Sequence, residues 1–198
     1  MAPGGSLPPQ RPEGSPSLPE KVLAIDAALG GARIPHAIGG ALALAYYAVP
    51  RGTVDVDVNV FVPVDRWPAV RDALEPLGVN VAADEAALER DGQVRLWWDR
   101  NPVDLFFSYD PFHEEMRRAA RRVPFAGETI PILSPEHLAV CKAMFDRAKD
   151  WIDIEQMIVA TDPLDLPEVE AWLQAMVGEQ NQRLTRLREI TARLGRDR

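Results

Sequence analysis

A run in which valine alternates with polar residues, at positions 54–60, constrains the fold of this chain more than any other stretch. Successive side chains of a β-strand point to opposite faces, so one face of this strand is expected to be apolar. The other face then carries Asp55, Asp57 and Asn59. The pattern predicts a strand that covers a core with one face and holds two carboxylates side by side on the other.

The two carboxylates admit two interpretations. Residues i and i+2 of a strand lie roughly 7 Å apart, so their side chains can converge on a hard cation such as Mg²⁺ or Mn²⁺. Alternatively, Asp55 and Asp57 form a solvated face that discourages edge-to-edge pairing of sheets. Gly39 and Gly40 follow an apolar run and precede a helix-like one, a place where backbone N–H groups can approach phosphate. This context favours the functional interpretation.

The pattern G-G-x-A, followed by R-x-T-x-D-h-D-h, resembles the signature of the DNA polymerase β-like nucleotidyltransferase superfamily, especially its small AbiEii-type branch. The matched residues are Gly39, Gly40, Arg51, Thr53, Asp55 and Asp57. The resemblance covers about residues 34–109. It implies an α+β fold, with a short mixed β-sheet flanked by helices. It also implies that the glycine pair holds a triphosphate and that the two acids bind metal.

A third acid, Asp104, stands inside an apolar β run at residues 103–109. An unpaired charge in such a run is costly, so the residues leave two alternatives, a cap after the polar turn at residues 99–102 or a third metal ligand. In the superfamily, a later, neighbouring strand supplies a third acid. The resemblance therefore implies that Asp104 joins Asp55 and Asp57 as a catalytic and metal-binding residue and prepares the attacking hydroxyl.

Residues 137–158 resemble the L-x-x-x-K…R-x-K-D-x-x-D motif that follows the core in AbiEii-like proteins. The resemblance implies that Lys142, Asp150 and Asp153 close over the nucleotide. The same charges are also typical of an ordinary helix face. Cys141 is expected in the core rather than as a nucleophile.

Periodicity and capping signals outline the remaining elements. Ser17 and Glu20 form a capping box, which predicts a helix that ends at Gly30. Strands are expected at 34–38, 54–62, 79–82, 93–98, 103–109, 122–125 and 129–133, and further helices at 41–48, 67–77, 84–90, 111–120, from 134, 172–177 and 183–194. We expect a disordered Pro-rich tail at 1–16, a nucleotidyltransferase core at 17–133 and a C-terminal helical region at 134–198.

Composition excludes several classes of protein. A net charge of −8 argues against a general nucleic-acid binder, and a single cysteine with three histidines argues against a disulfide or a zinc site. There is no G-x-x-x-x-G-K-[ST] motif, which disfavours a P-loop enzyme. No apolar span near 20 residues indicates a membrane segment, so the expected location is cytoplasmic.

These features predict a metal-dependent nucleotidyltransferase that moves NMP from an NTP to an acceptor hydroxyl, with Mg²⁺ or Mn²⁺ as cofactor. The AbiEii-like resemblance implies an RNA acceptor such as tRNA, and a toxin with an antitoxin partner. Arginines at 117–122 could meet RNA or a nucleotide tail, or could form a solvated helix end. Arginines at 183–198 could face tRNA or could form a partner-binding helix that protects the toxin. The alternatives are an aminoglycoside- or lincosamide-modifying enzyme, which the acidic surface would suit, and a nucleotide-binding module without turnover.

Overall fold

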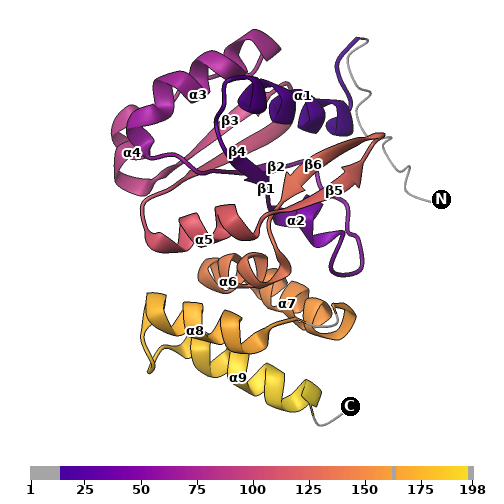
Figure 1. The fold of residues 1–198 in the computed structure, drawn as a ribbon, viewed down its shortest axis with the longest axis vertical. Helices are drawn as coiled ribbons and strands as arrows, with labels where there is room; N and C mark the ends of the chain where they lie inside the picture. The colour runs from indigo at the N-terminus through magenta and orange to yellow at the C-terminus, as the bar shows by residue number, and fades with distance from the viewer. Residues whose placement is uncertain (1–13, 162–163, 196–198) are drawn as a thin grey trace, which may run out of the picture.

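The computed structural model describes residues 14–161 and 164–195 of the 198-residue chain. Most of the tail predicted to be disordered therefore lies outside the described residues. Six strands form one mixed sheet in the order β3-β4-β2-β1-β6-β5 (Figure 1). Their bounds are β1 His36–Ile38, β2 Val56–Val60, β3 Gln93–Trp98, β4 Asn101–Phe107, β5 Arg121–Phe125 and β6 Glu128–Ile132.

A helix lies at each predicted position, although the one predicted at 41–48 has only five residues and the one predicted at 172–177 begins at Leu166. They are α1 Leu18–Gly31, α2 Gly40–Leu44, α3 Trp67–Leu74, α4 Glu85–Asp91, α5 Pro111–Ala119, α6 Pro135–Phe145, α7 Ala148–Ala160, α8 Leu166–Val177 and α9 Gln182–Gly195, with 3₁₀ turns at Val64–Arg66 and Glu75–Leu77. The capping box at Ser17 and Glu20 is present, and Gly78 ends the second 3₁₀ turn in a left-handed conformation.

Strand β2 lies in the middle of the sheet, antiparallel to β1 and parallel to β4. Its valines, at 56, 58 and 60, are fully buried, as the alternation predicts. The strand is shorter than predicted, however. Val54 is 60% exposed and precedes it, so Asp55 lies in the segment that leads into β2 rather than within it. The strand predicted at 79–82 is reduced to one bridge between Asn80 and Trp97.

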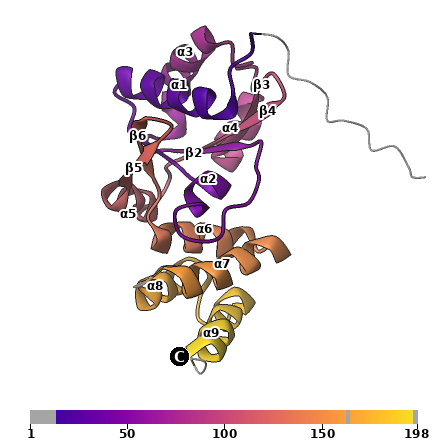
Figure 2. The same cartoon turned by 90° about the vertical axis from the view of Figure 1, so that its right-hand side faces the viewer.

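Helices cover the two faces of the sheet unequally. On one face, α1 packs against α3, β1 and β6. On the other, α2 packs against β2 and α6, and α6 in turn contacts α7, α8 and α9 (Figures 1 and 2). Among the residues described, no helix is long and apolar enough to cross a membrane.

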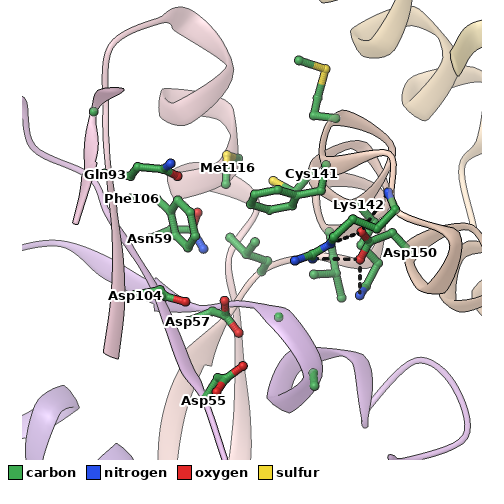
Figure 3. A pocket seen from close by; sticks show the side chains of 18 of the residues that line it. Asp55, Asp57, Asn59, Gln93, Asp104, Phe106, Met116, Cys141, Lys142 and Asp150 are labelled. Atoms are coloured by element: carbon green, nitrogen blue, oxygen red, sulfur yellow. Dashed lines mark hydrogen bonds and ion pairs between the residues drawn. The ribbon is translucent and has the colours of Figure 1, made fainter. Parts of the chain in front are cut away.

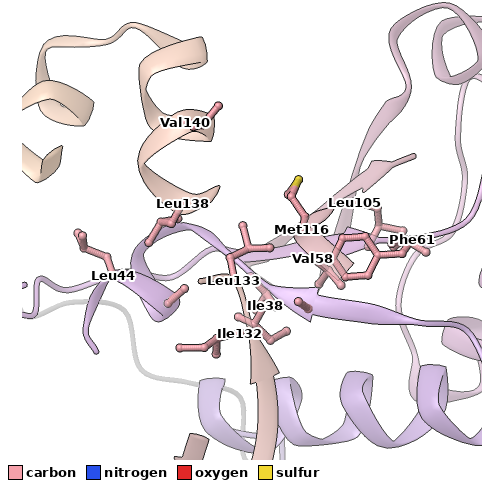
Figure 4. Packing of buried hydrophobic residues seen from close by; sticks show 14 of the residues in the cluster. Ile38, Leu44, Val58, Phe61, Leu105, Met116, Ile132, Leu133, Leu138 and Val140 are labelled. Atoms are coloured by element: carbon pink, nitrogen blue, oxygen red, sulfur yellow. The ribbon is translucent and has the colours of Figure 1, made fainter. Parts of the chain in front are cut away.

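One apolar core joins the sheet to the C-terminal helices. Ile38, Val58 and Leu105 from the sheet belong to the same buried cluster as Leu138 and Val140 from α6 (Figure 4). The predicted α+β class, a short mixed sheet flanked by helices and followed by a helical region, is thereby confirmed. The division into a core and a C-terminal helical region between residues 133 and 134 stays a prediction.

Candidate active site

The register of three neighbouring strands places charged residues in one row. Asp57 of β2 pairs with Asp104 of β4, and Asp104 pairs with Arg95 of β3. Because side chains alternate along each strand, these residues share one face of the sheet. Hence the structure brings Asp57 and Asp104 together, as the sequence predicts, and adds Arg95, which the sequence analysis did not identify.

The glycine pair lies directly beside this row. A β-carbon at Gly40 would lie 1.8 Å from Oδ2 of Asp57, and Gly40 has a φ of +55°. The N–H of Gly39 donates to the carbonyl of Asp57 at 2.8 Å. Gly40 therefore makes room for the Asp57 side chain, and Gly39 fixes its strand. The N–H of Gly39 is engaged within the protein, and a phosphate-binding role of the pair stays a prediction.

A hydrogen-bonded loop leads into the acidic strand. The hydroxyl of Thr53 accepts a hydrogen bond from the N–H of Asp55 at 3.1 Å. Arg51, at the start of this loop, forms an ion pair with Asp153 of α7 at 3.2 Å. Thr53 thus orients the backbone of Asp55, and Arg51 ties the loop to the helical region.

Asp57 is under electrostatic strain. Burial, followed by the charges of Asp104 and Asp55, raises its pKa from 3.8 to about 6. Within the part of the chain that the structure describes, no ion pair involves the carboxylate of Asp55 or Asp57. A cation placed between these carboxylates would relieve the repulsion.

Asp104, in contrast, has a partner. The guanidinium of Arg95 donates to both of its carboxylate oxygens, each at 2.7 Å. This bidentate pair raises the pKa of Arg95, which therefore stays protonated. The hairpin of β3 and β4 creates the pair, because its two-residue turn at positions 99–100 sets Arg95 opposite Asp104.

A buried set of charges stands on the helical side. Lys142 of α6 pairs with Asp153 at 2.6 Å and lies 3.9 Å from Asp150. Arg147 pairs with Asp150 at 2.6 Å. The predicted trio of Lys142, Asp150 and Asp153 is thus brought together as ion pairs. Lys142 and Asp150 line the cavity described next, whereas Asp153 lies behind them, and their contact with a nucleotide stays a prediction.

A cavity of about 270 Å³ separates the sheet from α6. Figure 3 shows Asp55, Asp57 and Asp104 on the side of the sheet, facing Lys142 and Asp150. Part of the wall is apolar and includes Phe106 and Phe145, whose rings meet edge to face at 5.8 Å. This apolar wall was not predicted from the sequence.

Cys141 also lines the cavity (Figure 3). Burial raises the pKa of its thiol to about 12. The protonated thiol is no nucleophile at neutral pH, which agrees with the interpretation of Cys141 as a packing residue.

The three acids fit a hard divalent cation by their chemistry. Carboxylate oxygens are the ligands that Mg²⁺ and Mn²⁺ prefer, and Mg²⁺ commonly takes only one or two of them beside water and phosphate. As the side chains stand in residues 14–161 and 164–195, no group of three or more His, Cys, Asp or Glu is placed to hold a metal ion. In this arrangement both carboxylate oxygens of Asp104 accept hydrogen bonds from Arg95.

Among the described residues, the arginines of the two clusters have acidic or carbonyl partners, apart from Arg186, which lies over the ring of Trp151. Arg117 and Arg118 pair with Glu114 and Glu115 on their own helix, and Arg121 pairs with Glu136. In α9, Arg183, Arg188 and Arg193 pair with Asp146, Glu170 and Glu155. These pairs favour the interpretation as charge-balanced helix faces.

Solved structures show what this fold resembles. The antibiotic-resistance factor ANT(2'')-Ia, in a solution structure, has a TM-score of 0.58 and 19% identity, covering 90% of this chain and 95% of that chain. The same factor in complex with adenylyl-2''-tobramycin has a TM-score of 0.53 and 19% identity, covering 78% and 93%. The lincomycin-bound lincosamide antibiotic adenylyltransferase LnuA has a TM-score of 0.52 and 12% identity, covering 71% and 96%.

No protein-family model matches the sequence, and no curated protein matches it either. The likeness to these solved structures, at 12% to 19% identity, is therefore one of fold alone. The AbiEii-type branch stays a prediction.

Proposed function

We propose that this protein is a metal-dependent nucleotidyltransferase that moves NMP from an NTP to an acceptor hydroxyl. One observation carries the proposal. The β2–β4 register sets Asp57 beside Asp104, with Asp55 immediately before β2, on the wall of a cavity whose opposite wall carries Lys142. A pair of adjacent acids and a third from a neighbouring strand is the arrangement that the resemblance implies.

The reaction forms a bond between the acceptor oxygen and the α-phosphorus of the NTP, and it breaks the bond from this phosphorus to the bridging oxygen of pyrophosphate. Asp55 and Asp57 would hold Mg²⁺ or Mn²⁺, which when bound supplies positive charge that stabilises phosphoryl oxygens. Asp104 would orient the acceptor hydroxyl and take its proton.

The basic residues of the cavity would receive the triphosphate. Lys142 and Arg147 supply positive charge across from the carboxylates, and each is held in place by the ion pairs with Asp150 or Asp153. Thr53 lines the same cavity beside Asp55. Arg51 would act mainly by bracing the loop against Asp153.

Two classes of acceptor are proposed. An RNA such as tRNA, with a toxin role and an antitoxin partner in the cytoplasm, follows from the AbiEii-like motifs. A small molecule such as an aminoglycoside or lincosamide is supported by two observations of this structure. The cavity has an apolar wall that includes Phe106 and Phe145. Among the described residues, the arginines that could have contacted RNA, apart from Arg186, bond to acids or to a carbonyl of the chain itself.

Each of the four NTPs, labelled at the α-phosphorus, should be incubated with the protein, Mg²⁺ or Mn²⁺, and bulk tRNA, tobramycin or lincomycin. Label in tRNA supports the RNA acceptor, and label in a drug supports the small-molecule acceptor. Intact NTP binding without transfer to any acceptor would contradict the proposal and favour a binding module.

A further inference from the structure

The ion pair between Arg95 and Asp104 distinguishes the third acid from the other two. Both oxygens of Asp104 accept hydrogen bonds from the guanidinium. The lone pairs of Asp104 that a cation would use are therefore already engaged. A divalent cation needs the same oxygens. Metal binding by Asp104 and pairing with Arg95 therefore compete.

The two partners differ in their freedom to move. Asp104 lies on β4, between β2 and β3, and its side chain is 14% exposed. Arg95 lies on β3, at the edge of the sheet, and its side chain is 56% exposed. A half-exposed arginine can exchange an ion pair for water at small free-energy cost. Arg95 is consequently the partner that can leave.

The buried pair between Lys142 and Asp153 provides a contrast within the same molecule. Both of its side chains are 5% exposed, so separating them would leave each charge buried without a partner. The pair is suited to a permanent structural role, whereas the pair between Arg95 and Asp104 is suited to exchange.

Asp55, Asp57 and Asp104 together form an acidic row, and the ion pair with Arg95 balances part of its negative charge. Asp57 and Asp104 are directly paired across β2 and β4, and Asp55 immediately precedes β2. In the described residues, Arg95 is the cation bonded directly to this row. Without it, the metal-free protein would hold three carboxylates together with no bonded positive charge. The guanidinium of Arg95 supplies positive charge to this row, as a bound metal ion would.

We propose that Arg95 is an exchangeable internal cation, which holds Asp104 in the metal-free protein and is displaced from it when a divalent metal binds the acidic row. Arg95 is then a positioning residue that acts through Asp104. The inference rests on the proposed function, because it takes Asp55 and Asp57 as metal ligands and adds Asp104 to them as a third.

Direct measurement of Mn²⁺ affinity by electron paramagnetic resonance tests the exchange without turnover. In Arg95→Gln the competing cation is lost, and we expect the dissociation constant for Mn²⁺ to fall about threefold to tenfold. Asp104→Asn should weaken binding. In the double variant, the effect of Arg95→Gln should shrink to less than about twofold, since it acts through Asp104.

Arg117→Gln is the matched control, because Arg117 donates to both carboxylate oxygens of Glu114 and neither residue lines the cavity. It should leave Mn²⁺ affinity unchanged. Unchanged or weaker binding by Arg95→Gln, with native circular dichroism, would overturn the exchange and leave Arg95 a purely structural residue. An undiminished effect of Arg95→Gln in the Asp104→Asn background would also overturn the exchange. Such a result would indicate an effect of overall charge rather than one that acts through Asp104.

Failure of the inference can be told apart from failure of the proposed function. If Arg95→Gln tightens Mn²⁺ binding while no NMP transfer occurs, the exchange stands and the catalytic proposal fails. If transfer occurs but Arg95→Gln binds Mn²⁺ no better than the wild-type protein, the catalytic proposal stands and the exchange fails. Absence of Mn²⁺ binding by both proteins overturns the exchange.

Discussion

The backbone of Gly40 lies so close to the side chain of Asp57 that a β-carbon at position 40 would stand 1.8 Å from Oδ2 and 2.4 Å from Cγ. The glycine turn and the acidic strand are thus one structural unit. Their association in the sequence motif has a steric cause in addition to any contact with phosphate.

Gly40→Ala should displace Asp57 and destabilise the protein. The left-handed φ alone costs a residue with a side chain about 1–2 kcal/mol, and the clash with the carboxylate adds to this. Thermal unfolding and NMP transfer measure the two effects. Gly52→Ala is the control, because nothing lies within 4 Å of the β-carbon that it adds. Equal stability of the two variants would show that the close approach is not rigid.

Asp57→Asn should stabilise the metal-free protein at neutral pH. The pKa of Asp57 is raised from 3.8 to about 6, so the folded protein binds more protons than the unfolded chain between these values. Stability from this residue is present below pH 4 and is lost as the pH rises through 6. The gain of the variant at pH 7–8 should be at most about 3 kcal/mol.

Urea denaturation with a chelator, at pH 4.5 and pH 7.5, checks this expectation. The wild-type protein and Asp57→Asn should differ more at pH 7.5 than at pH 4.5. A difference that is larger at the lower pH would contradict the electrostatic account of this carboxylate.

Asp55→Asn should abolish transfer and spare the fold. Asp55 precedes β2, outside the buried face of the strand, so replacing its carboxylate with an amide should leave the unfolding temperature nearly unchanged. Transfer should fall by about a hundredfold or more, because a metal ligand is lost. Asp65→Asn, at an exposed position in the 3₁₀ turn after β2, should retain full activity. Similar activity of both variants would remove Asp55 from the site.

Lys142→Met should destabilise the protein severely. It leaves the buried carboxylate of Asp153 with only the more exposed Arg51, and such one-sided removal costs about 3–5 kcal/mol. The double variant Lys142→Met, Asp153→Leu should recover much of this loss. A stable Lys142→Met protein that fails only in NTP binding would instead assign Lys142 to the nucleotide alone.

Much of the sheet could be predicted because its signals are local. Alternating valines at 56, 58 and 60 predict the buried face of β2, and the resemblance placed Asp104 on a neighbouring strand. The extent of β2 was overestimated, since alternation continues to Val54 although the chain has already left the sheet. Periodicity alone does not show where neighbouring strands end.

Arg95 was missed because of one turn. A polar turn at residues 99–102 was predicted, whereas the hairpin turns over two residues, with Asp99 at a φ of +53°. The shorter turn shifts the register by two residues and brings Arg95 opposite Asp104. An Asp-Arg pair is a weak turn signal compared with Asn-Gly or Asp-Gly, so the sequence did not reveal the correct register. The apolar wall was missed because Phe145 reaches Phe106 from α6, a contact that depends on tertiary packing.

The most direct test of the account is the position of Mn²⁺ in crystals grown with Mn²⁺ and an α,β-methylene NTP, located by anomalous diffraction. We predict an ion about 2 Å from carboxylate oxygens of Asp55 and Asp57. We also predict that Asp104 turns toward this ion and is released from Arg95. Mn²⁺ bound elsewhere, or nucleotide bound in the cavity with the three carboxylates free of metal, would contradict it.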